Sequence, residues 1–155
     1  MTQPRITQVE LPQLLAEADQ VVCLAVADAE TENLMNARSF SLMKPTAFFI
    51  NPSRGNLVDE AALLQALDAG TIAGCALDVG RAPDQMPTPA LARNPGVIAT
   101  PHVGGQTPPV IEHQALETVA QAAEILQGCA PAGAVNADRA DRLARLAGMA
   151  RPAST

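Results

Sequence analysis

Four polar side chains each lie at the end of a short apolar run of the sequence. Ser53 and Arg54 follow "AFFIN", Asp78 ends "IAGCALD", and His102 follows "GVIAT". A guanidinium keeps its charge and binds carboxylates through paired hydrogen bonds. An imidazole, whose unperturbed pKa is about 6.5, both donates and accepts protons near neutral pH. Together, these residues would bring a cation, a carboxylate and an imidazole to one cleft, and the imidazole could act as an acid or a base.

The apolar runs are predicted to be buried strands that alternate with helices. Short buried strands linked by helices indicate a parallel sheet covered on both faces, an α/β fold. The carboxyl ends of such strands meet at one edge, where ligands bind. The expected strands cover 20–26, 47–51, 72–79 and 96–100. The expected helices cover 11–19, 31–43, 58–70 and 109–128. Thr31 is the expected N-cap of the second helix, and Asp59 lies at the start of the third. Residues 80–95 are expected to be loop with one helical turn.

Each candidate residue also has a purely structural interpretation. Arg54 could be a surface arginine, Asp78 could cap a turn, and His102 could be a polar residue at a strand end. Glu60 is interpreted as a favourable acidic residue in the first turn of its helix. The second histidine, His113, falls on an amphipathic helix and is expected to be solvated or partly packed.

Composition narrows the class of protein. The chain has 155 residues, 48% of them hydrophobic and 2% aromatic, which fits one helix-rich domain with a core of small residues. A net charge of -6 argues against nucleic acid or an anionic membrane as a partner. Three scattered cysteines without a Cys-x-x-Cys pair indicate no metal site. With no signal peptide and no apolar run of membrane-spanning length, we expect a cytoplasmic protein.

Two longer stretches resemble a known family. "FFINPSRGNLVDEAALLQALDAGTIAGCALDV" followed by "PGVIATPHVGGQT" is similar to the D-isomer-specific 2-hydroxyacid dehydrogenases, over about Leu11 to Gly128. The resemblance is to the second half of the NAD-binding domain. It implies a Rossmann-like, partial doubly wound parallel sheet flanked by helices, and NAD or NADP as cofactor. It also implies a small 2-hydroxy or 2-oxo acid as substrate.

The resemblance also implies roles for individual residues. Arg54 would bind the substrate carboxylate, and His102 would give a proton to the substrate oxygen as hydride reaches the carbon. Asp78 would contact the nicotinamide side of the cofactor. The remaining cofactor contacts, beside Arg54 and His102 themselves, would come from Pro52, Ser53, Gly104 and Gly105.

The sequence departs from the family pattern in two places. The glutamate that pairs with the family's histidine is absent from "DVGRAP", where Ala82 precedes the proline and Asp84 is the nearest acidic residue. Relatives that act on formate have glutamine at that place. The sequence also contains no Gly-x-Gly, the turn that holds a cofactor pyrophosphate.

These observations give three expectations of function. The first is an NAD(P)-dependent D-2-hydroxyacid dehydrogenase that is truncated and not expected to turn over alone. Its partial NAD(P)-binding Rossmann domain would cover 1–136, followed by a tail over 137–155 that could form a short helix. The alternative is a non-catalytic binding or assembly module derived from that family. An unrelated flavodoxin-like domain is a third and weaker option. Half of a doubly wound sheet would leave an apolar face uncovered, so we also predict a homodimer or larger homo-oligomer.

Overall fold

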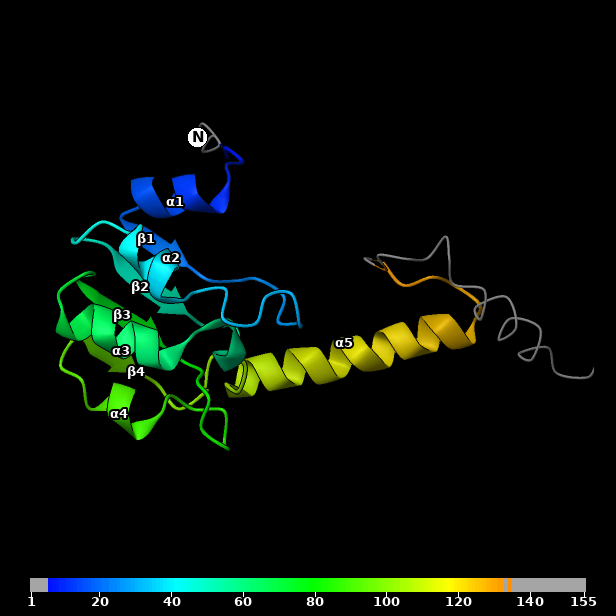
Figure 1. Cartoon of the computed structure of the whole chain (residues 1–155). Coiled ribbons are helices and arrows are strands. Elements are labelled where there is room, and N and C mark those ends of the chain that lie inside the picture. The colour runs from blue at the N-terminus through cyan, green and yellow to red at the C-terminus, as the bar shows by residue number, and fades with distance from the viewer. Residues whose placement is uncertain (1–5, 133, 135–155) are drawn as a thin grey trace, which may run out of the picture. The chain divides into compact units, whose positions relative to one another are not determined.

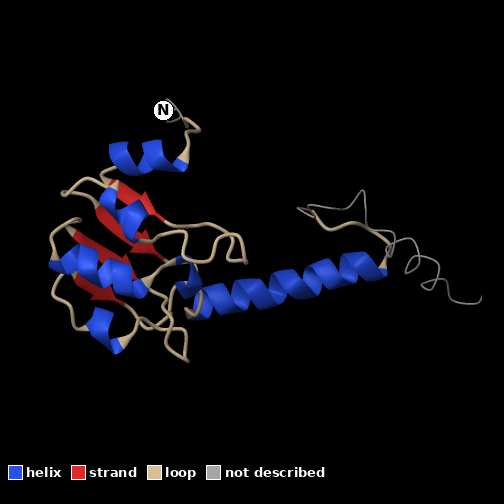
Figure 2. Cartoon of the chain, in the orientation of Figure 1, coloured by secondary structure: helices blue, strands red, loops and turns tan. Residues whose placement is uncertain are grey.

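Strands and helices alternate along the computed structural model, which describes residues 6–132 and 134. The strands are β1 (Gln20–Val22), β2 (Phe48–Asn51), β3 (Gly74–Leu77) and β4 (Val97–Ala99). The helices are α1 (Leu11–Glu17), α2 (Ala37–Ser41), α3 (Glu60–Asp68), α4 (Pro89–Ala92) and α5 (Pro108–Leu126), with the 3-10 turn η1 (Gly55–Leu57) (Figures 1 and 2). The chain divides into two compact units between Gly104 and Gly105.

The first unit is built around a four-stranded sheet whose strand order, β1-β2-β3-β4, follows the sequence. All three strand pairs are parallel, with Phe49 beside Val21 on one flank and beside Cys75 on the other. Cys75 in turn pairs with Val97. The predicted parallel α/β architecture is therefore confirmed.

One face of this sheet packs against the helices and forms the core. Phe49 is fully buried and its ring meets that of Phe40 from α2 edge-on, with centroids 5.5 Å apart. Consecutive helices contact one another along this face, and α2 and α3 lie in front of the strands in Figure 2. Other core side chains are Leu15, Met35, Leu57, Leu63, Cys75, Leu77 and Leu91.

The opposite face of the sheet is open within the first unit. The expectation that helices cover both faces is wrong for this unit, whereas the uncovered apolar face expected of half a doubly wound sheet is present. Val22, Phe48 and Ile98 point to this face and are 49%, 50% and 71% exposed. The reason is topological: each right-handed crossover moves one strand further in the same direction, which places every crossover helix on the same side.

Every described strand is shorter than expected, and the first strand and the second helix differ most from their predictions. The first strand ends at Val22, and the helix expected over 31–43 is reduced to α2. Thr31 is not its N-cap, because its hydroxyl donates to the carbonyl of Val26 (2.7 Å) and closes a loop. Asn36 takes the capping role and accepts hydrogen bonds from the amides of Arg38 and Ser39.

The other helices agree with their predictions. The side chain of Asp59 caps α3 by accepting from the Ala62 amide (3.0 Å). The single turn expected within 80–95 is α4. In the second unit, α5 begins at Pro108 and is followed by Gly128 in the left-handed conformation (φ 79°). The predicted tail over 137–155 lies outside the described residues, and the boundary at 136 stays a prediction.

None of the described helices combines the length and apolar character that crossing a membrane would require.

Candidate functional site

The loops that follow β2, β3 and β4 carry the predicted site residues. Because the three strands are parallel neighbours, these loops leave the same edge of the sheet. The first loop holds Pro52, Ser53 and Arg54, the second begins at Asp78, and the third contains His102 and Gly104. All of these belong to the first unit, whereas Gly105 is the first residue of the second unit.

The loop after β2 is held by Asn51, a buried polar residue at the strand's end. Its Nδ2 donates to the carbonyl of Arg54 (2.9 Å), and its Oδ1 accepts from the amide of Ser53 (3.1 Å). The Ser53 hydroxyl donates to the carbonyl of Ala25 (3.2 Å), which ties this loop to the segment after β1. The backbone of Ser53 and Arg54 is therefore fixed, while the Arg54 side chain is exposed.

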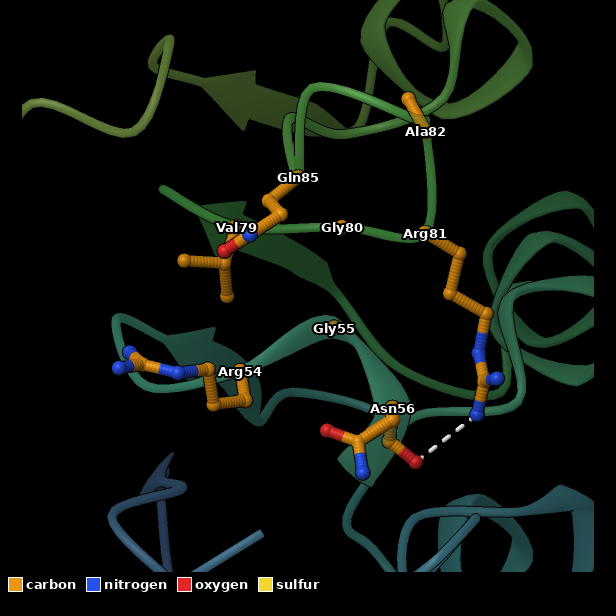
Figure 3. A pocket seen from close by; sticks show the side chains of 8 residues that line it. All are labelled: Arg54, Gly55, Asn56, Val79, Gly80, Arg81, Ala82 and Gln85. Atoms are coloured by element: carbon orange, nitrogen blue, oxygen red, sulfur yellow. Dashed lines mark hydrogen bonds between the residues drawn. The ribbon is translucent and has the colours of Figure 1, made fainter.

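Arg54 lines a cleft of about 460 Å³ between the loops after β2 and β3 (Figure 3). Its Nη1 donates to the carbonyl of Ser53 (2.7 Å), and among the described residues its guanidinium forms no ion pair. The lining of the cleft is Arg54, Gly55, Asn56, Val79, Gly80, Arg81, Ala82 and Gln85. An uncompensated guanidinium in a cleft without a carboxylate in its lining is suited to binding an anion.

Two glycines let the walls of the cleft approach closely. A Cβ atom on Gly55 would collide with the carbonyl group of Gly80. A Cβ atom on Gly80 would collide with the carbonyl of Met86 and lie 2.8 Å from Oε1 of Glu60. The width of the cleft is thus set by direct backbone contact between the two loops.

Arg81, the second arginine of the cleft, is fully engaged in holding the loops together. Its Nε donates to the carbonyl of Val58 (2.9 Å), and its Nη2 donates to Glu32 Oε1 (2.7 Å), with further bonds to Asn33 and Asn56. The hydrogen bond from Arg81, with its positive charge, holds the pKa of Glu32 below its ordinary value. In Figure 3 the side chains of Arg54 and Arg81 extend in different directions.

Glu60 has a structural role beyond the favourable helix start that the sequence predicts. Its Oε1 accepts from the backbone amide of Arg81 (2.8 Å), so the first turn of α3 supports the loop after β3. A local helix pattern cannot indicate this bond, because the partner is distant in sequence.

Asp78, at the end of β3, organises the loop that follows β4. Its Oδ1 accepts from the hydroxyl of Thr100 (2.6 Å) and the amide of Val103 (2.9 Å), and its Oδ2 accepts from the amide of Gly104 (2.8 Å). Desolvation raises the pKa of Asp78, but these three hydrogen bonds and the nearby His102 outweigh it and leave that pKa below its ordinary value.

His102 lies within the loop that Asp78 holds. Its backbone is in the left-handed region (φ 54°), uncommon for a residue with a side chain, and its amide donates to the carbonyl of Thr100 (3.0 Å). A Cβ atom on Gly104 would lie 2.9 Å from Asp78 Oδ2, so glycine leaves room for the carboxylate. The structure therefore places Asp78 and His102 in one cluster beside the Arg54 cleft, whose described lining contains neither.

Three residues of the site have no counterpart among the predicted ones: Asn51, Arg81 and Gln85. The polar end of "AFFIN" is the one sequence signal that could have drawn attention to Asn51. Asp84, expected as the nearest substitute for the family's glutamate, accepts from the amide of Met86 (3.1 Å) within a turn. No group of metal-binding side chains occurs among the described residues.

Comparisons with known proteins agree with this architecture. A sequence model described as D-isomer specific 2-hydroxyacid dehydrogenase, NAD binding domain, matches residues 1–104. D-3-phosphoglycerate dehydrogenase of Synechocystis sp. is 38% identical over 130 residues, which are 84% of this chain and 23% of that protein. Glyoxylate/hydroxypyruvate reductase B of Escherichia fergusonii is 40% identical over 128 residues, which are 82% of this chain and 39% of that protein.

A solved structure with the same fold is that of a D-isomer specific 2-hydroxyacid dehydrogenase from Lactobacillus delbrueckii ssp. bulgaricus in its NAD complexed form. It superposes with a TM-score of 0.69 at 31% identity and covers 81% of this chain and 42% of that chain. This likeness confirms the Rossmann-like fold. The chain spans less than half the length of these three proteins.

Proposed function

Because the chain belongs to the D-isomer specific 2-hydroxyacid dehydrogenase family, we propose that it carries the substrate side of a site that interconverts 2-hydroxy and 2-oxo acids with NAD or NADP. The observation that carries this proposal is the placement of Arg54, Asp78 and His102 directly after three adjacent parallel strands. The carboxyl edge of such a sheet is where nucleotide cofactors and their substrates bind.

Arg54 is proposed to bind the carboxylate of the acid. Its guanidinium projects into the cleft from a backbone that Asn51 fixes, so the charge is presented from a rigid support. A planar guanidinium can hold a carboxylate through two hydrogen bonds and orient the neighbouring carbonyl group.

His102 is proposed to move the proton. In the reducing direction, its protonated imidazole would donate a proton to the carbonyl oxygen while the carbonyl carbon takes up the hydride that a bound nicotinamide cofactor would supply. In the oxidising direction, the neutral imidazole accepts the proton of the hydroxyl group. Asp78 holds the loop that presents His102 and is a positioning residue in this proposal.

The residues at this edge suit the nicotinamide end of a dinucleotide. When bound, the cofactor supplies or accepts the hydride that the protein's own side chains cannot provide. Pro52, Ser53 and Gly104 lie at the strand ends where the ring would approach, and Gly104 lacks the Cβ atom that would crowd Asp78. Arg54, Asp78, His102 and Gly105 complete the proposed cofactor contacts.

The direct test measures both binding and turnover. The chain is titrated with NADH and NADPH, followed by fluorescence, and assayed for reduction of glyoxylate and hydroxypyruvate. Any turnover shown by the wild-type chain should be abolished by His102→Ala and left unchanged by His113→Ala, which changes the other histidine. Failure of the wild-type chain to bind either cofactor at millimolar concentration would instead favour the binding or assembly module.

A second candidate, the assembly module, is favoured by the open face of the sheet. We propose that this face, with Val22, Phe48 and Ile98 exposed, is covered by another copy of the chain in a homo-oligomer. Sedimentation at micromolar concentration should then show a dimer or larger species, which Ile98→Lys should weaken without changing the circular dichroism spectrum. A compact wild-type monomer would contradict this.

The expected cytoplasmic location stays a prediction.

A further inference from the structure

We propose that the Arg54 cleft selects 2-oxo acids with a single negative charge and a hydrogen-bonding substituent, and that Gln85 recognises this substituent. The inference rests on the proposed function and deepens it by naming the class of substrate. The supporting observations are the eight residues that line the cleft and which of its two arginines has an ion-pair partner.

The first step is the charge balance of the cleft. Arg81 forms an ion pair with Glu32 (2.7 Å) and donates to oxygen atoms of Asn33, Asn56 and Val58, so its charge is already paired. Arg54 donates to one backbone carbonyl and lies in an ion pair with none of the described residues. The cleft therefore offers one free positive charge, which matches one carboxylate.

A second anionic group on the substrate would find no uncompensated positive charge among the lining residues of the cleft. Apart from the two arginines, its lining consists of uncharged residues, Asn56, Val79, Ala82 and Gln85 among them. Bringing a phosphate or a second carboxylate into this space removes part of its hydration without providing a counter-charge. A monoanion is therefore preferred over a dianion or a phosphorylated acid.

The second step concerns Gln85, whose backbone is held in an unusual conformation. It has a φ of 62°, a region that a residue with a side chain seldom occupies. The strain is maintained by two hydrogen bonds: the Gln85 amide donates to the carbonyl of Ala82 (2.7 Å), and the Gly80 amide donates to the carbonyl of Gln85 (2.9 Å). Strained residues held by their surroundings concentrate at ligand-binding sites.

The side chain of Gln85 extends from its loop toward Val79, on the wall of the cleft opposite Arg54 (Figure 3). Within the described part of the chain, its amide group forms no hydrogen bond, so both its donor and its acceptor are available. An amide can pair with either a hydroxyl or a carbonyl group. In the proposed binding mode, Arg54 holds the carboxylate and a hydroxyl substituent of the acid pairs with the amide of the exposed Gln85.

The test compares four acids that differ at the substituent: pyruvate, hydroxypyruvate, oxaloacetate and 3-phosphohydroxypyruvate. Each is titrated calorimetrically into the full chain. We expect hydroxypyruvate to bind about three- to tenfold more tightly than pyruvate, the effect of one neutral hydrogen bond. The two acids with additional charge should bind more weakly than hydroxypyruvate.

Variants then assign the preference to Gln85. Gln85→Gly removes the amide and relieves the left-handed strain, and Gln85→Asn retains a shorter amide on a residue that tolerates this conformation. Both should bind pyruvate like the wild type, while Gln85→Gly loses the preference for hydroxypyruvate. Gln85→Lys should strengthen binding of 3-phosphohydroxypyruvate about tenfold, and Gln65→Lys, the same charge change on the exposed surface of α3, should not.

The outcomes distinguish a failure of the proposed function from a failure of the role given to Gln85. If the wild-type chain binds none of the acids, or if Arg54→Ala binds them equally well, the proposed function fails and this inference fails with it. If Arg54 is required but Gln85→Gly keeps the preference for hydroxypyruvate, or the wild type prefers the phosphorylated acid, the inference alone is overturned.

Discussion

At the scale of single residues, one carboxylate connects two of the strand ends that form the site. Asp78 accepts three hydrogen bonds, from Thr100, Val103 and Gly104, and His102 lies between those partners in the sequence. A sequence pattern can place an aspartate at a strand end, but it cannot indicate which donors the carboxylate will bind. The role of Asp78 as a support for His102 therefore emerges only from the structure.

We expect Asp78→Asn to loosen the loop that carries His102. An asparagine can still accept from Thr100 and Val103, but its NH₂ group cannot accept from the amide of Gly104. Loss of a charge-assisted bond costs about 1.5–3 kcal/mol. Hydrogen exchange at Val103 and Gly104 should accelerate at least about tenfold, and any turnover should fall while affinity for the carboxylate at Arg54 is kept.

The matched control is Asp84→Asn, which changes another loop aspartate that accepts, among the described residues, from the amide of Met86 alone. Its effect should be confined to residues near that turn. Equal exchange rates for the Gly104 amide in wild type and Asp78→Asn would contradict the positioning role.

The lowered pKa of Asp78 makes a pH prediction with a definite sign. A carboxyl group whose pKa is lower in the folded state stabilises the fold above its unfolded pKa, about 3.9, and this contribution is lost as the pH falls through the lowered value. The side-chain carboxyl carbon resonance of Asp78, which reports the protonation of this carboxyl group directly, should therefore hold its chemical shift from pH 7 to about 4 and move only below that. Movement centred above pH 5 would be incompatible with a lowered pKa.

At the scale of elements, the sequence pattern was sufficient for the alternation of strands and helices but not for their ends. "AFFIN" and "IAGCALDV" contain β2 and β3, because short apolar runs of this kind are fully buried strands. The helix expected over 31–43 was wrong over its first half, since Thr31 and Asp28 close a loop by hydrogen bonds that compete with a helical start. Asn36 caps the shorter helix instead, and asparagine ranks above threonine as an N-cap residue.

The contact between the loops after β2 and β3 leads to a prediction about Gly55. Gly55→Ala would push a methyl group into the Gly80 carbonyl, so the two loops must separate. Overpacking of this kind costs about 1–3 kcal/mol, and we expect the upper part of that range because both partners are backbone. Urea unfolding of the variant should show the loss.

Gly96→Ala provides the comparison. A Cβ atom there would lie 3.3 Å from Asn94 Oδ1, a side-chain atom that can shift, so the variant should be close to wild type in stability. If Gly55→Ala were as stable as Gly96→Ala, close backbone contact would not be what sets the width of the cleft.

At the scale of the whole molecule, the sheet is covered by helices on one side only within the first unit. The sequence could predict strands buried in a parallel sheet, but equal apolar runs do not reveal which face the crossovers leave bare. That depends on strand order, which is sequential here, and sequential order places all crossover helices together. Exposed Phe48 and Ile98 are the result.

Thiol reactivity offers a measure of the integrity of the whole molecule. Burial raises the pKa of Cys75 to about 12 and also raises that of Cys23, whereas Cys129 is exposed. A disulfide reagent at pH 8 should therefore modify one thiol of the native chain quickly, and the other two only upon unfolding. Fast modification of Cys75 in the native chain, identified by mass spectrometry, would show that the sheet opens.

The sequential order of the strands also has a consequence for how the site is assembled during synthesis. Each strand adds to an edge that earlier residues have already formed, so β1 to β3 can pair before β4 exists. The Arg54 cleft needs nothing beyond Gln85, whereas the three donors that hold the His102 loop extend to Gly104. A nascent chain can thus expose the described lining of the Arg54 cleft before His102 has emerged from the ribosome.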